Sequence, residues 1–253
     1  MSSTESTAAT RRRPLMLLHG AGGGVGVNYA PLLEGLADTH EVFGLDYPGA
    51  GDQPRSAAPL TLDDLVDAAI ADADRRGVEI FALAGYSLGT SVAIRLASRY
   101  PDRVESLVLT AGFAALDTSS ALAIDLWKLL YEAGDAQALG EYMLSVASSR
   151  SRVDSLSLDQ VRDIAGGLGA SFPAGTADHL DLVHRVDVRA ELASIVVPTL
   201  VVITAQDRLI SPQVQVAVAE GIERSEIVRL ESGHLPFLEA PHEWADAVAR
   251  FLS

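Results

Sequence analysis

The stretch LAGYSLGTSV, residues 83–92, places one serine, Ser87, between two glycines directly after an apolar run. Residues 79–85 have the composition of a buried strand, and residues 89–99 have the spacing of a helix. The pattern G-x-S-x-G between a strand and a helix is typical of a turn that lifts a serine hydroxyl to the edge of a sheet. Glycines are needed beside such a strained turn because side chains would collide with its neighbours. Ser87 is therefore predicted to be a catalytic nucleophile.

Similar apolar runs flank this stretch, and segments with helical spacing separate them. The predicted strands are 14–18, 41–46, 79–85, 104–112, 198–205 and 226–230, and the predicted helices between them are 28–38, 61–76, 89–99, 212–222 and 241–252. The runs are almost continuously apolar, as expected for strands that are covered on both faces. Strand–helix alternation predicts an α/β fold with a doubly wound, mostly parallel sheet of about six strands.

The alternation stops between Gly112 and Pro198. This segment contains helical periodicity at 119–134, 135–150, 156–169 and 174–186, and no convincing strand. Crevices in open parallel sheets lie at the carboxyl ends of the strands, so helices inserted after such an end favour a cap over a site. We expect an α/β core of residues 14–112 and 190–253, a helical cap of residues 113–189, and a disordered tail of residues 1–13.

The bulk composition limits the possible partners. The formal net charge of −15 argues against a nucleic acid or an anionic membrane as partner. No cysteine is present, which excludes disulfides and thiolate metal sites. The stretch TRRRPLMLL (10–18) resembles a twin-arginine export signal, but its apolar part is too short for one. We expect a cytoplasmic protein that acts on a small molecule, with a homo-oligomer left open.

A serine hydroxyl is a weak nucleophile and needs a base. Of the six histidines, His234 lies in a loop just after the last predicted strand. Asp207 follows the preceding strand, where a carboxylate could hold the second imidazole nitrogen. Asp117, in the loop after 104–112, is the competing acid. Both acids fit the chain order serine, acid, histidine. Asp207 is better placed, because it follows the strand before the last one and the helix start Ser211-Pro212 lies just beyond it.

The glycine-rich loop HGAGGGVGVNY (19–29) follows the first predicted strand. Acyl transfer needs amide donors for an oxyanion, and we expect them from Leu88 and from Ala21 or Gly22. The loop also loosely imitates the dinucleotide pattern G-x-G-x-x-G, with Asp46 further along, but the spacing fails. No His, Asp or Glu cluster has metal-ligand spacing. We therefore expect neither a cofactor nor a metal.

With DYPGAGDQP (46–54), PTLVVITAQD (198–207) and SGH (232–234), these motifs resemble the α/β-hydrolase superfamily, in particular its serine hydrolases with a small helical cap. Carboxylesterases, enol-lactonases, cofactor-free haloperoxidases and carbon–carbon bond hydrolases are of this kind. The resemblance covers most of the chain outside the expected cap. Three departures stand out. Gln53 replaces the usual serine, Thr90 replaces a frequent glycine, and too few residues precede Pro14 for the usual N-terminal hairpin, which we expect to be reduced or missing.

The large side chains of the expected cap are the candidates for substrate contact. They are Phe113, Trp127, Tyr131, Tyr142 and Phe172, and Met143 lies among them. An apolar roof with one polar centre suits a small, largely uncharged ester, lactone or thioester. We expect a serine hydrolase that forms an acyl-enzyme. The alternatives are carbon–carbon cleavage, acyl transfer, perhydrolysis or elimination by the same triad, and a ligand-binding protein on a hydrolase scaffold.

Overall fold

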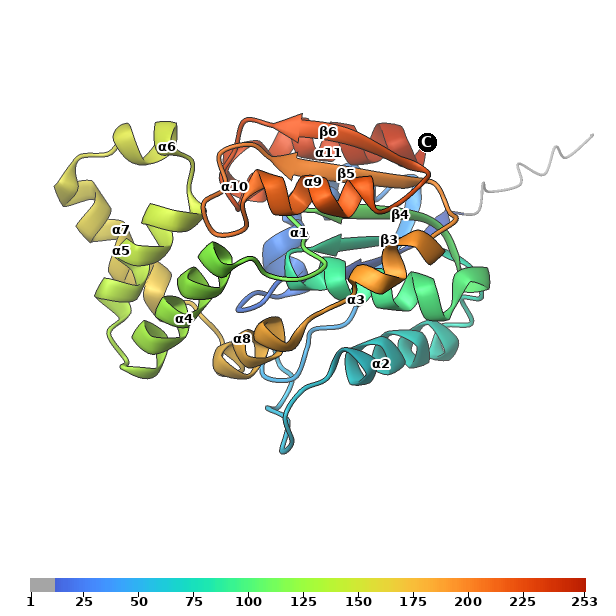
Figure 1. Ribbon diagram of the computed structural model, residues 1–253, viewed down its shortest axis with the longest axis horizontal. Helices are drawn as coiled ribbons and strands as arrows, with labels where there is room; N and C mark the ends of the chain where they lie inside the picture. The colour runs from blue at the N-terminus through green and yellow to red at the C-terminus, as the bar shows by residue number, and fades with distance from the viewer. Residues whose placement is uncertain (1–11) are drawn as a thin grey trace, which may run out of the picture.

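A computed structural model describes residues 12–253 and contains one six-stranded sheet with the order β2-β1-β3-β4-β5-β6 (Figure 1). The strands are β1 (Arg13–Leu18), β2 (His40–Gly44), β3 (Phe81–Tyr86), β4 (Val104–Thr110), β5 (Thr199–Thr204) and β6 (Ser225–Leu230). Every neighbouring pair is parallel. All six predicted strands are present, so the predicted α/β fold with a parallel sheet is confirmed.

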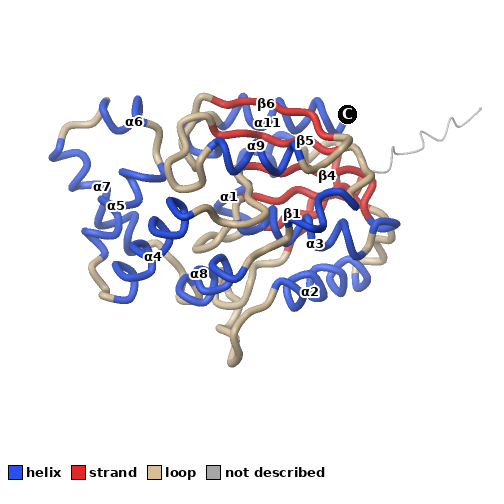
Figure 2. The backbone as a smooth tube through the Cα atoms, in the orientation of Figure 1, coloured by secondary structure: helices blue, strands red, loops and turns tan. Residues whose placement is uncertain are grey.

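Helices cover both faces of this sheet (Figure 2). Leu15 and Leu17 of β1 belong to a core shared with α1 (Val25–Gly35) and α11 (Pro241–Leu252). The alternate residues Met16 and Leu18 belong to a second core, shared with α2 (Leu62–Arg75), α3 (Leu88–Arg99) and α9 (Pro212–Glu220). Because successive side chains of a strand point to opposite faces, an apolar run of this kind is buried on both sides. The sheet is therefore doubly wound, as predicted.

The chain leaves the sheet after β4 and returns before β5. The intervening helices are α4 (Thr118–Glu132), α5 (Ala136–Ala147), α6 (Arg150–Asp154), α7 (Leu158–Ala170) and α8 (Thr176–Arg185). Both ends of this excursion meet at a bridge between Ala115 and Asp187, beside a 2.8 Å hydrogen bond from the amide of Val188 to the carbonyl of Ala114. In Figure 1, α5, α6 and α7 lie at one end of the molecule, away from the sheet.

The helices of this excursion begin where the sequence offers a capping oxygen. Asp117 and Asp135 accept hydrogen bonds from the third residue of α4 and of α5. Ser157 and Gln160 form a reciprocal capping box at the start of α7. Such side chains satisfy amides that have no partner inside the helix. Short polar residues therefore set the boundaries of these helices.

The remaining short elements are η1 (Pro101–Arg103), η2 (Arg189–Ser194) and α10 (Pro236–Glu239). Strand β1 begins at Arg13, the last residue of the predicted tail. The predictions of a disordered tail and of a reduced or missing hairpin mostly concern residues 1–11, which lie outside the described residues. Between residues 12 and 253, no helix has both the length and the apolar character needed to cross a bilayer.

Candidate active site

Ser87 forms the turn between β3 and α3 with a φ of 51° and a ψ of −120°. A positive φ is costly for a residue with a side chain and persists only where its surroundings enforce it. A Cβ on Gly89 would overlap the carbonyl oxygen of Leu18, and one on Gly85 would overlap that of Gly89. Both obstacles are backbone atoms, which explains why glycine is required on each side of Ser87.

Thr90 also holds this turn. Its hydroxyl donates a 2.6 Å hydrogen bond to the carbonyl of Ser87 and accepts a 3.3 Å bond from the amide of Phe113. Gly112 leaves the necessary space, since a Cβ there would lie 2.6 Å from Thr90 Cγ2. The departure at Thr90 is thus accommodated within the turn. Gln53, another departure, is exposed on the loop after β2.

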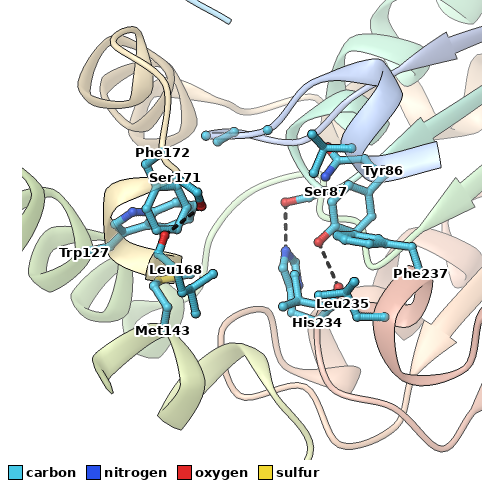
Figure 3. A pocket seen from close by; sticks show the side chains of 16 residues that line it. Tyr86, Ser87, Trp127, Met143, Leu168, Ser171, Phe172, His234, Leu235 and Phe237 are labelled. Atoms are coloured by element: carbon cyan, nitrogen blue, oxygen red, sulfur yellow. Dashed lines mark hydrogen bonds between the residues drawn. The ribbon is translucent and has the colours of Figure 1, made fainter. Parts of the chain in front are cut away.

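The structure brings Ser87, His234 and Asp207 together from three separate loops at the carboxyl ends of the strands. His234 Nε2 lies 3.0 Å from Ser87 Oγ (Figure 3), and His234 Nδ1 lies 2.7 Å from Asp207 Oδ2. The exposed fractions are 8% for Ser87 and 4% for both His234 and Asp207. The three side chains therefore form a continuous chain of hydrogen bonds from a carboxylate through an imidazole to a hydroxyl.

The carboxylate of Asp207 is oriented by several donors. The amides of Leu209 and Ile210 each donate a 2.9 Å bond to Oδ1. The Thr204 hydroxyl and the side-chain amide of Gln215 donate to Oδ2 at 2.9 and 3.1 Å. These bonds stabilise a buried charge and leave Oδ2 directed at His234. Gln215 was not predicted, because its position on α9 gives no hint that its side chain is fully buried.

Asp117, the competing acid, lies elsewhere. Its Oδ1 accepts a 2.7 Å bond from the amide of Ser120, and its Oδ2 is 3.5 Å from the hydroxyl of Ser211. It therefore caps α4 and is not the partner of His234. The other carboxylate considered at the sequence level, Asp46, accepts a 2.7 Å bond from the amide of Val25 and caps α1.

The loop after β1 has most of its amides engaged. The amide of Gly20 donates to Asn28 Oδ1 at 3.0 Å, and that of Gly23 donates to the carbonyl of Gly20 at 3.2 Å. The amide of Gly22 donates to His179 Nδ1 at 3.2 Å. The expectation that Gly22 can serve as an oxyanion donor is therefore corrected, because its N–H already has a partner. The amide of Ala21 has none among the described residues.

His19 supports the same loop from the side of the core. Burial lowers the pKa of His19 to about 4, so the ring is neutral at physiological pH. Its Nδ1 donates a 2.8 Å bond to the carbonyl of Gly20, and its Nε2 accepts one of 2.8 Å from the amide of Tyr47. This pairing explains a histidine at the end of a buried strand without giving it a role in the chemistry.

A cavity that opens to solvent lies above Ser87 and His234. Its far wall comes from α4, α5 and α7 and from the loop after α7, and Figure 3 shows Trp127, Met143, Leu168 and Phe172 across from Ser87. The near wall includes Val27, Tyr86, Leu235, Phe237 and Leu238. None of the described residues that line it is Asp, Glu, Lys or Arg. The cavity therefore suits an uncharged, mainly apolar ligand.

Two of the five expected contact residues, Trp127 and Phe172, line this cavity, and Phe113, Tyr131 and Tyr142 do not. Phe113 is 1% exposed and belongs to the core beneath the site. The hydroxyls of Tyr131 and Tyr142 donate to the carbonyls of Pro173 and Ala123 at 2.9 and 2.6 Å. These two tyrosines therefore join helices and loops of the excursion to each other.

Asn28 and Tyr86 were missed at the sequence level although both line the cavity. The Tyr86 hydroxyl donates a 2.9 Å bond to the carbonyl of His234, and Asn28 holds the amide of Gly20. The signals in the sequence were the adjacency of Tyr86 to Ser87 and the place of Asn28 in the glycine-rich stretch 19–29. No group of three or more His, Cys, Asp or Glu side chains in residues 12–253 is placed to hold a metal ion.

Residues 15–247 match the family described as the alpha/beta hydrolase family. The chain belongs to this family. The match covers all of the strands except the first two residues of β1, the turn at Ser87 and the loops that carry Asp207 and His234, so the resemblance seen in the motifs is confirmed.

Relatives of this hydrolase include two that cover nearly all of the chain. A pyrrolizixenacetamide deacetylase from Xenorhabdus hominickii is 28% identical over 240 residues, which are 94% of this chain and 90% of that protein. A pimeloyl-[acyl-carrier protein] methyl ester esterase from Neisseria meningitidis is 30% identical over 242 residues, 92% of this chain and 74% of that protein.

The enol-lactonase from Burkholderia xenovorans LB400 has a similar structure, with a TM-score of 0.82. The two chains are 21% identical, and the similarity covers 97% of this chain and 93% of the other. At that identity the likeness establishes the shared fold.

Proposed function

We propose that this hydrolase cleaves a small, largely apolar carboxylic ester, lactone or thioester through an acyl-enzyme on Ser87. The observation that carries the proposal is the continuous chain of hydrogen bonds among three buried side chains: 3.0 Å from Ser87 Oγ to His234 Nε2 and 2.7 Å from His234 Nδ1 to Asp207 Oδ2. A neutral imidazole between a hydroxyl and a carboxylate can take the hydroxyl proton and have its positive charge stabilised.

In the first half of the reaction, Ser87 Oγ attacks the carbonyl carbon while its proton moves to His234 Nε2. The carbonyl electron pair moves to the oxygen, where the amides of Ala21 and Leu88 stabilise the negative charge. The tetrahedral intermediate then collapses. It expels the alcohol or thiol, which takes the proton from His234, and an acyl group remains on Ser87.

In the second half, His234 takes a proton from water as the water oxygen attacks the acyl carbon. The second tetrahedral intermediate expels Ser87 Oγ, which recovers its proton from His234. The net reaction consumes one ester bond and one water and releases a carboxylic acid and an alcohol or thiol. With a lactone, both groups remain in one molecule.

The cavity supports the proposed substrate class. We infer that α4–α8 act as a cap and that Trp127 and Phe172 contact the substrate from it, because both line the space across from Ser87. An uncharged lining favours binding of apolar groups and disfavours an unpaired charge. The names of the two relatives, a deacetylase and a methyl ester esterase, agree with a small group on one side of the cleaved bond.

Turnover of p-nitrophenyl acetate by wild type and by Ser87→Ala tests the proposal. We expect turnover by the wild-type protein and a loss of kcat on the order of 10⁶-fold in the variant, with an unchanged melting temperature. A variant that retains the wild-type rate would contradict it, as would a wild-type protein that hydrolyses none of a series of acetate, butyrate and hexanoate esters.

A further inference from the structure

We propose that His179, on helix α8 of the cap, is a positioning residue that holds the loop of residues 19–23 so that the amide of Ala21 faces the oxyanion. This inference rests on the proposed function, because it concerns the donor that the reaction would use. It assigns the cap a part in building the catalytic site as well as in covering the substrate.

The contacts of His179 define one tautomer. Its Nδ1 accepts a 3.2 Å hydrogen bond from the amide of Gly22, and its Nε2 donates one of 3.0 Å to the carbonyl of Pro48. Only a neutral ring with its proton on Nε2 satisfies both bonds. The ring is fully buried, and burial lowers the pKa of His179 below its usual value, which favours this neutral form.

Helix α8 is itself attached to the core beside this ring. The amide of Gly175 donates a 2.9 Å bond to the carbonyl of Gly49, and Arg55 makes two 2.9 Å bonds to Asp178. The ring of Tyr47 packs edge-on against the imidazole, with 5.9 Å between the centroids. His179 therefore reaches Gly22 from a fixed base, although the two residues are 157 positions apart.

Gly22 is the residue through which this contact acts on Ala21. Its φ of +65° lies in the left-handed region, and Trp127 and Phe172 occupy the space where a Cβ would be. The cap thus contacts Gly22 through the amide and through the α-carbon. The preceding peptide joins Gly20 to Ala21 and carries the N–H of Ala21, which has no partner among the described residues. Without the bond from Gly22 to His179, the loop could rotate at Gly22, and the N–H of Ala21 would change direction.

His19, at the end of β1 in the core, holds the carbonyl of Gly20, which belongs to the same peptide as the N–H of Ala21. The core therefore anchors the beginning of the loop, and the cap anchors its end. A preorganised donor stabilises the transition state because it does not have to reorient as charge develops. A misplacement of about 1 Å can cost on the order of 10²-fold in rate. Loss of the His179 bond should therefore lower kcat and leave KM almost unchanged.

The variants His179→Asn and His179→Gln form a matched pair. In Asn, Oδ1 takes the place of Nδ1 and can accept the amide of Gly22, whereas the bond to Pro48 is lost. In Gln, Nε2 takes the place of the ring Nε2 and can donate to Pro48, whereas the acceptor for Gly22 is lost. With p-nitrophenyl acetate we expect kcat within about threefold of wild type for Asn and a fall of roughly 10- to 100-fold for Gln.

Hydrogen exchange of the Gly22 amide, measured by NMR, tests the contact without any turnover. We expect slow exchange in wild type and Asn and fast exchange in Gln. Fast exchange in folded wild type overturns the proposal, and so does an equal kcat effect in both variants. If wild type hydrolyses no ester, the proposed function fails, while the exchange pattern still decides whether His179 holds Gly22. Melting temperatures show whether each variant is folded.

Discussion

The carboxylate of Asp207 is surrounded by donors, and one of them is the imidazole of His234 at 2.7 Å. In Asp207→Asn, the oxygen can keep the amides of Leu209 and Ile210, which leaves an NH₂ group facing His234 Nδ1. The imidazole would then carry its proton on Nε2 and could not accept one from Ser87. We expect kcat to fall on the order of 10⁴-fold with the fold retained, measured with p-nitrophenyl acetate.

Asp117→Asn is the matched control, because it makes the same chemical change at the acid that competes with Asp207 in the sequence. Asparagine caps helices about as well as aspartate, so α4 should be kept. We expect wild-type kcat and stability. A large loss of rate in this variant together with an active Asp207→Asn variant would reverse the assignment.

At the scale of residues, the motifs and their order along the chain predict that Ser87, Asp207 and His234 meet, because the carboxyl ends of parallel strands lie at one edge of the sheet. They do not reveal which backbone amides are free. The amide of Gly22 donates to His179, and that bond depends on how α8 is placed on the core. Neither periodicity nor spacing contains this information.

At the scale of elements, α5 and α7 cross at very short range. A Cβ on Gly169 would overlap the carbonyl oxygen of Ala136, and one on Gly140 would overlap that of Ala165. Gly167, on the same helix as Gly169, is exposed and has open space where a Cβ would be. Gly169 and Gly167 therefore differ in packing while sharing one helix.

Gly169→Ala should lower the free energy of unfolding by about 1–3 kcal/mol, since the two helices must move apart. Gly167→Ala should raise it by roughly 0.5–1 kcal/mol, because alanine favours a helix interior. Urea unfolding of both variants checks this pair. Equal effects of the two substitutions would show that the close crossing does not contribute to stability.

Helical periodicity located the long helices between β4 and β5 to within a few residues, whereas α6 was not separated from its neighbours. Periodicity also identified large side chains without revealing what they contact. Tyr131 and Tyr142 use their hydroxyls to join parts of the excursion, and Trp127 and Phe172 line the cavity. A 3.6-residue period defines the face of a helix but does not say which face meets the site.

At the scale of the whole molecule, folding buries His19 completely and lowers its pKa from 6.5 to about 4. Between these two values the unfolded chain binds a proton at this site and the folded chain does not. Stability therefore rises with pH across this window and is lost as the pH falls, by roughly 1.4 kcal/mol per pH unit for one such group. Above pH 6.5 this contribution is constant.

We expect the free energy of unfolding in urea to fall between pH 6.5 and pH 4 and the ring of His19 to remain neutral at pH 5.5 by NMR. A His19→Gln variant should show a shallower pH dependence than wild type. Parallel curves for the two proteins, or a ring that is protonated at pH 5.5 in the folded state, would contradict the effect of burial.

The central claim is that Ser87 carries the acyl group during the reaction. Mass spectrometry of protein mixed with p-nitrophenyl acetate and quenched in acid within the first turnovers measures this directly. The account predicts one acetyl group per chain, on the peptide that contains Ser87, and none on Ser87→Ala. Acetylation at another residue, or steady hydrolysis by wild type with equal activity in Ser87→Ala, would contradict it.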